Sequence, residues 1–134
     1  MGAWGSGNFE NDTAADHVLT LSRQLLGQIE ATVEDGSAME PDEYDSEVMM
    51  CNLEILACLA EHLGRYEKGS VAERLFPDVL PEASVVATWK TKYLDVWDSY
   101  IDKLRPKPEY KRQRRAVIVE TFDRVTQLSS RNRG

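Results

Sequence analysis

Apolar side chains recur every three or four residues along four stretches of the chain, a spacing typical of one face of an amphipathic α-helix. The stretches predict helices over about 12–34, 42–63, 81–104 and 109–129, with a shorter helix over about 71–76. Alternation of apolar and polar positions, the pattern of a half-buried strand, is scarce. We therefore expect an all-α fold with four main helices in a bundle-like single domain that spans residues 1–134.

The same spacing predicts which side chains face inward. The expected inner faces are Val48, Ile55, Leu56, Leu59 and Leu63 on the second helix, Trp89, Tyr93, Trp97 and Tyr100 on the third, and Val117, Ile118, Phe122, Val125 and Leu128 on the fourth. Asn52 falls within the second of these helices on the apolar side, so it must find hydrogen-bond partners if it is buried. Residues 130–134 are expected to form a frayed tail.

The first eleven residues are rich in glycine and carry two large aromatic side chains, Trp4 and Phe9. Glycine permits tight backbone turns, and aromatic rings are costly to leave in water. We therefore predict that residues 1–11 form an ordered loop docked on the helices. Asn11 or Asp12 is expected to cap the first helix, because either side chain can accept a hydrogen bond from a free amide at the helix start.

The opening stretch also carries a family likeness. It reads Met1-Gly2-Ala3-Trp4-Gly5-Ser6-Gly7-Asn8-Phe9-Glu10-Asn11-Asp12 and resembles a bacterial family known as domain of unknown function 4259, whose members open with Met-Gly-Ala-Trp-Gly-x-Gly-x-Phe-x-Asn-Asp. A looser likeness lies in the second helix, where Glu54 is followed by Ala57. There, Cys51, Asn52 and Leu53 replace the family's usual alanines. The resemblance implies a bacterial, cytoplasmic, helical protein, and it implies no activity.

Glu54 has small neighbours on the second helix, which allow another segment to approach it closely. We predict a structural anchor made of Trp4, Phe9, Asp12 and Glu54. In this anchor the Glu54 carboxylate accepts hydrogen bonds from backbone N–H groups of the opening loop or from the Trp4 indole. The alternative is that Glu54 belongs to a solvated acidic face with Glu47 and Glu61.

Charge is distributed unevenly along the chain. Residues 1–62 hold 13 acids and one base, whereas residues 103–134 hold ten bases and three acids, and the net charge is −7. An acidic protein is a poor general ligand for nucleic acid, because phosphate contacts need a basic surface. The uneven charge is explained either by a basic segment that packs beside the acidic ones or by two interaction surfaces.

Charged residues on three of the helices are candidates for contact with a protein partner. They are Glu47, Glu61, Asp95, Asp98, Asp102, Lys111, Arg112, Arg114 and Arg115. The basic run from Lys111 to Arg115 lies near a helix start, where cations oppose the helix dipole, so local helix propensity does not explain it. The run either pairs with the acids from Asp95 to Asp102 or faces an acidic partner; nucleic acid is the least favoured of its ligands.

Catalytic and cofactor-binding patterns are absent from the sequence. Gly2, Gly5 and Gly7 lack the Lys of a phosphate-binding loop, and neither His17 nor His62 belongs to the Glu-x-x-His motif of di-iron bundles. Cys51 and Cys58 are seven positions apart on one helix, too far for a disulfide, and two free thiols suit a reducing cytoplasm. We expect no metal, no cofactor and no catalytic residue, and no apolar run reaches the length of a membrane span.

These observations predict a cytoplasmic, non-enzymatic, acidic protein-binding module. Its most concrete form is an antidote-like (toxin immunity) protein that caps a basic toxin surface with acidic faces at residues 34–61 and 95–102. One alternative is a small enzyme with a carboxylate site at Asp12, Asp16 and Glu54. The other is a homo-oligomeric structural protein, and the choice between a monomer and a small homo-oligomer stays open.

Overall fold

The computed structural model of the protein describes residues 2–131, with the backbone alone for residues 76, 77 and 131. Its long helices are α1 (Asp12–Glu34), α2 (Tyr44–Leu63), α5 (Ala83–Tyr100) and α6 (Pro108–Arg131). Shorter segments connect them: η1 (Gly36–Met39), α3 (Val71–Arg74), α4 (Phe76–Val79) and η2 (Ile101–Leu104). Within the described residues the only β pairing is an isolated bridge between Ala3 and Asn11. The predicted all-α fold with four main helices is confirmed.

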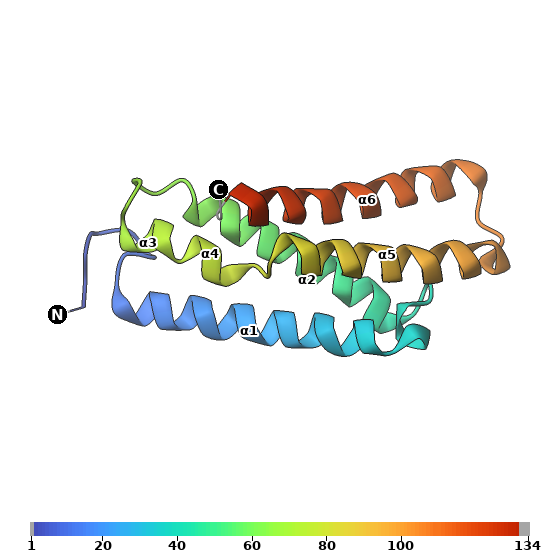
Figure 1. Ribbon diagram of the computed structural model, residues 1–134, viewed down its shortest axis with the longest axis horizontal. Helices are drawn as coiled ribbons and strands as arrows, with labels where there is room; N and C mark the ends of the chain where they lie inside the picture. The colour runs from blue at the N-terminus through green and yellow to red at the C-terminus, as the bar shows by residue number, and fades with distance from the viewer. Residues whose placement is uncertain (1, 132–134) are drawn as a thin grey trace.

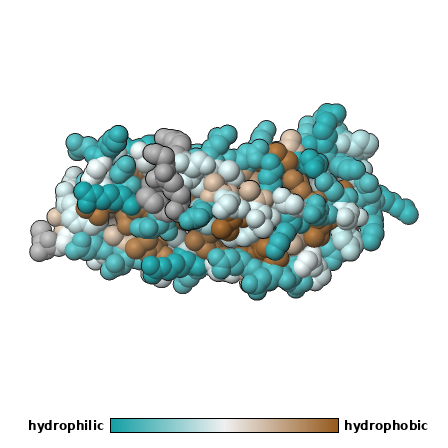
Figure 2. All heavy atoms as spheres, viewed as in Figure 1, coloured by the Kyte–Doolittle hydropathy of each residue, from teal (hydrophilic) through white to brown (hydrophobic). Residues whose placement is uncertain are grey.

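The long helices pack as two antiparallel pairs, α1 with α2 and α5 with α6, and α2 lies against α6 to join the pairs (Figure 1). α1 and α5 run in the same direction and contact each other only lightly. The chain crosses from α2 to α5 through α3 and α4, at the end of the bundle that also holds the opening loop. Figure 2 shows a largely hydrophilic face on which hydrophobic atoms surface in separate patches along the middle of the view, where α4 and α5 lie above α1.

Local backbone chemistry sets the ends of the helices. Asn11 caps α1, as predicted, by accepting a hydrogen bond from the Ala14 amide at 2.8 Å. α2 begins later than expected because Asp42 has a φ of 72°, outside the right-handed helical region. The predicted third helix likewise begins later, at Ala83, and its end tightens into η2. Residues 130 and 131 belong to α6, and residues 132–134 of the expected frayed tail lie outside the described residues.

Aromatic side chains of α5 form the centre of the core. Trp89, Tyr93 and Trp97 are buried, as predicted, and the Tyr93 ring packs on Phe122 of α6 with 5.7 Å between ring centroids. Tyr100, the last member of the predicted stripe, is 37% exposed, because the helix has by then reached the end of the bundle. Tyr93, in the middle of the stripe, therefore packs α5 against α6.

The buried faces of α2 and α6 are rotated from the predicted ones. Ile55 is 47% exposed and Val117 is 44% exposed, so the prediction that they lie inside is wrong. The buried side chains of α2 include Met49, Met50, Leu53, Leu56, Ala57, Ala60 and Leu63. Asn52 is also buried, and it donates a hydrogen bond to Gln28 of α1 at 3.0 Å. Because α1 and α6 both cover α2, its buried face is wider than one stripe.

A buried hydroxyl pair ties α5 to the start of α2. The Tyr93 hydroxyl lies 2.9 Å from Ser46 Oγ, which donates to the Met39 carbonyl at 3.1 Å. Burial raises the pKa of Tyr93, so the hydroxyl is neutral at pH 7. Tyr93→Phe should lower the free energy of unfolding by about 1 kcal/mol.

The matched control is Tyr100→Phe on the same helix, where the ring is more exposed, and it should change stability by less than about 0.5 kcal/mol. Urea denaturation followed by tryptophan fluorescence measures both variants. Equal effects of the two substitutions would contradict a stabilising role for the buried hydroxyl pair.

Candidate functional site

The opening loop folds back on the start of α1. The Trp4 amide donates to the Glu10 carbonyl at 2.9 Å, and the Asp12 amide donates to the Gly2 carbonyl at 2.7 Å. These two hydrogen bonds flank the bridge between Ala3 and Asn11. Residues 2–12 therefore form a small closed turn that ends at the cap of α1.

The Trp4 indole donates to Asp12 Oδ1 at 3.0 Å, so its partner is Asp12 and the predicted contact with Glu54 is wrong. The closed turn brings Trp4 beside the first residue of α1, whereas Glu54 is solvent-exposed in the middle of α2. No hydrogen bond to Glu54 is found among residues 2–131, so Glu54 is solvated as the alternative held, although Glu47 and Glu61, the other residues of that face, pair with arginines of α6. Trp4 and Asp12 thus keep their anchoring role, and Glu54 does not share it.

Two carboxylates occupy the space that the loop glycines leave. A Cβ added at Gly2 would overlap the Asp12 carboxylate and lie 2.9 Å from Asp12 Cβ. A Cβ at Gly5 or Gly7 would overlap the Glu10 carboxylate. A phosphate would meet these negative groups in the same space, so the arrangement disfavours an anion-binding loop. The constraint is strongest at Gly2, because Asp12 Cβ is fixed to the backbone of α1, whereas the end of the Glu10 side chain can move away from Gly5 and Gly7.

Phe9 docks the loop on the end of α2. Its ring lies 5.2 Å from the His62 ring in an edge-on arrangement, and His62 makes a similar contact with Tyr66 at 5.6 Å. Phe9 also packs against the buried core. The prediction that the glycine-rich opening is docked is confirmed.

Basic side chains of α6 pair with acidic side chains of α2 and α5. Arg115 donates two hydrogen bonds of 2.9 Å to Asp98, and Arg124 donates two of 2.7 Å to Glu61. The further contacts across helices are Lys111 with Asp102 at 2.8 Å, Lys90 with Asp123 at 2.7 Å, and Arg114 with Glu47 at 3.2 Å. Arg112 pairs with Glu109 within α6. The interpretation that the basic segment packs beside the acidic ones is confirmed.

Because of these ion pairs, most of the acids that were predicted to contact a partner have their charge offset by a base. Glu47, Glu61, Asp98 and Asp102 each have a basic neighbour, and of the predicted acidic contact residues only Asp95 has no ion pair among the described side chains. The Arg115 guanidinium lowers the pKa of Asp98, and Asp98 raises the pKa of Arg115. Whether these residues contact a partner stays a prediction, but they contribute little uncompensated charge to one.

Uncompensated acids gather instead where α1 ends and α2 begins. We call this surface the acidic end and define it as Asp35, Asp42, Glu43, Tyr44 and Asp45. All five side chains are exposed, and the carboxylates make no ion pair with any side chain that the structure describes. The Ser37 hydroxyl donates to Asp35 at 2.7 Å and lowers the pKa of this carboxyl, which therefore stays charged.

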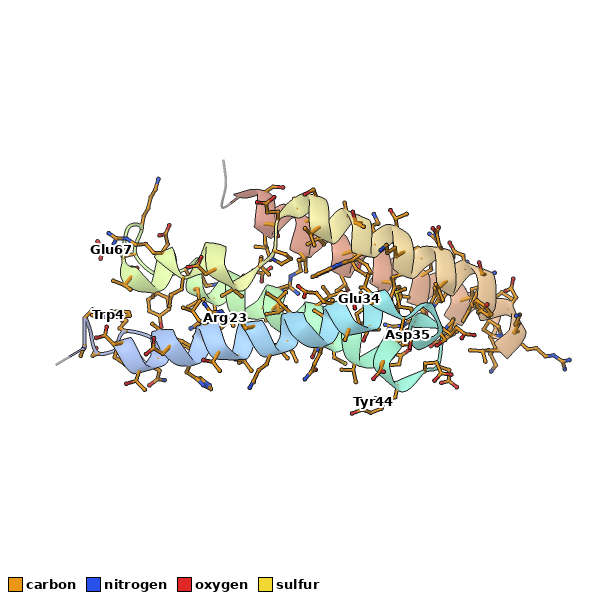
Figure 3. The ribbon with its side chains drawn as sticks, turned by 60° about the horizontal axis from the view of Figure 1, so that its bottom comes forward. Trp4, Arg23, Glu34, Asp35, Tyr44 and Glu67 are labelled. Atoms are coloured by element: carbon orange, nitrogen blue, oxygen red, sulfur yellow. The ribbon has the colours of Figure 1, made fainter. Side chains whose placement is uncertain are left out.

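Tyr44 is the most prominent member of the acidic end. Its side chain is 80% exposed, and Figure 3 shows it projecting from the start of α2, with Glu34 and Asp35 at the end of α1 nearby. A hollow of about 340 Å³ lies beside it between the two helices. The hollow is lined by Gln28, Ala31, Thr32, Asp35, Ala38, Tyr44, Asp45 and Val48. Sequence reasoning included this stretch in a broad acidic face but did not single out Tyr44, although the run of acids around an aromatic residue was visible.

A second hollow of about 310 Å³ borders Asp42 on the other side of the acidic end. Its walls include Trp97, Leu104 and Tyr110, and the ion pair between Glu47 and Arg114 lies at its rim. Leu104 is 50% exposed and Tyr110 is 55% exposed. The acidic end is therefore bordered by two hollows that hold accessible apolar surface.

The residues of the alternative carboxylate site do not form an enclosed site. Asp12, Asp16 and Glu54, the carboxylates of the alternative enzyme site, are all exposed. Among the described side chains, no three His, Cys, Asp or Glu residues lie where they could hold a metal ion. Within residues 2–131, no helix has the length and apolar character that crossing a bilayer requires.

Comparison with known proteins places the chain by family alone. The model of a family described as domain of unknown function (DUF4259) matches residues 2–131. No curated protein and no solved structure matches the chain.

Gly2→Ala should open the docked loop, because the added methyl group displaces Asp12 from the Trp4 indole. The Trp4 and Asp12 amides should then exchange hydrogen roughly tenfold faster, the effect of losing about 1.4 kcal/mol of local stability. The control is Gly27→Ala in α1, where an added Cβ meets nothing within 4 Å. It should leave loop exchange unchanged and raise the free energy of unfolding by about 0.5–1 kcal/mol. Unchanged exchange in Gly2→Ala would contradict this account of the motif.

Asp98 should make stability depend on acid pH. Arg115 holds the pKa of Asp98 in the folded protein below its value in the unfolded chain. The ionised Asp98 therefore stabilises the fold fully above the unfolded pKa, and this stabilisation is lost as pH falls through the folded pKa. The free energy of unfolding should therefore decrease below about pH 4, and less so in Asp98→Asn. The control Asp95→Asn, on the same helix without an ion pair in the described part of the chain, should retain the wild-type dependence. Urea titrations between about pH 2 and pH 7 measure this, and identical curves for the two variants would count against it.

Proposed function

Since the chain belongs to the family described as domain of unknown function (DUF4259), we propose that it is a non-enzymatic module that captures a basic protein partner through its acidic end. The proposal concerns the surface formed by Asp35, Asp42, Glu43, Tyr44 and Asp45. Its most concrete form is an antidote-like role, in which this surface caps the basic surface of a toxin.

The observation that carries the proposal is the exposure of Tyr44 among carboxylates without ion pairs in the described structure. Its 80% exposed ring is large, rigid and polar at one end, as interface hot spots often are. A Lys or Arg side chain of a partner can stack on the ring while its charge meets Glu43 or Asp45. Both kinds of contact favour a basic protein surface over an acidic one.

The distribution of charge supports the same end of the molecule. The bases of α6 lie against acids of α2, α5 and η2, so Glu47, Glu61, Asp98 and Asp102 carry paired charges. Arg23 is the only base in residues 1–62, which leaves the acidic end without a basic residue nearby in sequence. A negative patch of this kind speeds encounter with a basic partner.

A cytoplasmic location is part of the proposal. Cys51 and Cys58 are both free and exposed. Exposed thiols persist in a reducing compartment and tend to form disulfides in an oxidising one. The partner that we propose is therefore a cytoplasmic protein.

The test replaces the acidic end while conserving the fold. In the variant Glu43→Lys/Tyr44→Ala/Asp45→Lys, affinity for a basic partner should fall at least about 30-fold, the effect of losing a hot spot worth about 2 kcal/mol. Each product of a neighbouring gene is co-purified with the tagged protein, and the Kd of any complex is measured by calorimetry at two salt concentrations. Binding should weaken with salt, because uncompensated charge drives it.

The matched control is Glu54→Lys/Glu120→Lys, which makes the same change of net charge at exposed positions on α2 and α6. It should bind nearly as tightly as the wild type, and circular dichroism should show equal helicity in all three proteins. Equal loss of affinity in the control would show that net charge, and not the acidic end, governs binding. Failure of every neighbouring gene product to bind would contradict the antidote-like role.

A further inference from the structure

A shallow groove runs between α1 and α5, on the side of the bundle where the long helices touch least. It includes a hollow of about 350 Å³ whose floor contains Val33, Val85 and Trp89. Val85 is 39% exposed, although it lies among buried neighbours. Some of the hydrophobic patches in Figure 2 lie in the part of the view where α5 runs above α1.

The apolar floor continues beyond this hollow along both helices. On α5, Val85, Trp89 and Val96 recur at helical spacing, and Val96 is partly buried against the core. On α1, Leu26 lies two turns before Val33 and is also partly buried. The accessible apolar surface is therefore elongated along the helix axes.

Unpaired charges line the rims of the groove. Glu30 and Glu34 on α1 and Lys92 on α5 border the hollow, and none of them forms an ion pair with another described side chain. Figure 3 shows Glu34 on α1 at the side that faces α5. The α1 rim thus offers two carboxylates in successive turns, whereas Glu47, Glu61 and Asp98 on the other helices are offset by bases of α6.

We propose that this groove binds an amphipathic α-helix whose apolar face contacts Val33, Val85 and Trp89 and whose basic edge pairs with Glu30 and Glu34. This inference rests on the proposed function, because the helix is taken to belong to the same basic protein partner. The inference adds two points to the proposed function: the bound segment of the partner is helical, and it contacts a second surface besides the acidic end.

A helix suits the groove better than an extended peptide does. The walls are the interiors of two α-helices, whose backbone N–H and C=O groups are already bonded within each helix. An extended segment would find no strand edge to pair with, whereas a helix satisfies its own backbone and needs only side-chain contacts. Packing a helix between two others is also the usual way in which apolar stripes of helices are buried.

The groove ends where the acidic end begins. Glu34 is the last residue of α1, and Asp35 of the acidic end follows it directly. Glu34 borders the hollow toward α5, whereas Asp35 and Tyr44 border the hollow toward α2, so the two surfaces lie on different sides of α1. One partner can contact both surfaces, which together carry most of the uncompensated acids of residues 30–45.

The test uses three synthetic peptides of about 20 residues with one apolar face. One has Lys along the edge of that face, one has Glu there, and one has Lys with two central Pro residues that prevent a helix. The Lys-edged helical peptide should bind at least tenfold more tightly than the other two by fluorescence anisotropy. It should perturb the backbone NMR signals of Glu30, Glu34, Val85 and Lys92.

Variants of the protein locate the site. Val85→Asp and Glu30→Lys/Glu34→Lys should each weaken this peptide at least tenfold, and Glu54→Lys/Glu120→Lys should not. Val85 lies in the first turn of α5, where Asp is compatible with helix formation, and the rim variant keeps the test valid if Val85→Asp fails to fold.

The outcomes separate this inference from the proposed function. Peptide signals confined to Tyr44 and its neighbours, with no effect of Val85→Asp, would overturn the groove and leave the acidic end standing. Concentration-dependent dimers that Val85→Asp abolishes would show that a second copy of the chain occupies the groove, which also overturns it. If the natural partner binds the acidic-end variant as tightly as the wild type, the proposed function fails whatever the peptides do.

Discussion

The distribution of charge on the surface of this protein depends on the ion pairs between α6 and its two neighbours, α2 and α5. α6 carries the basic residues that face Glu47 and Glu61 on α2 and Asp98 on α5. Each pair at such an exposed site contributes only about 0–1 kcal/mol, so the fold itself rests on the buried apolar core. The pairs matter more for where charge remains, since they offset the acids on two sides of the bundle and leave those of α1 and the start of α2 uncompensated.

Helical periodicity predicted the number of long helices, their approximate positions and the burial of Trp89, Tyr93 and Trp97 in α5. It could not predict the edges of the buried faces, because Ile55 and Val117 lie at positions where a small rotation of the helix exposes a side chain. Their exposure depends on how α2 and α6 are turned against each other. The spacing of apolar residues along the sequence does not determine how far each helix is rotated about its axis.

The opening motif was predictable as a docked loop but not in its contacts. Glycine and aromatic residues indicated close packing, and Phe9 on His62 supplies it. The Trp4 indole was expected to be one of the donors to Glu54, a distant carboxylate on α2, whereas it donates to Asp12, only eight residues from Trp4. The basic run of α6 is explained by tertiary contacts and not by its own helix. Its bases oppose the dipole of that helix, and they are stabilised by the acids of α2 and α5 beside them.

The open side between α1 and α5 follows from how α1 is held. Its start is fixed by the docked loop, its length packs on α2, and its end turns into η1, which contacts α2 and α5. With these attachments α1 keeps its place without close packing against α5. Val85 and the Glu30 and Glu34 carboxylates can therefore remain at the surface while the core stays closed. The loosely packed side of the bundle is apolar at the floor and acidic along one rim, and these are the two features on which the proposed binding of a basic helix depends.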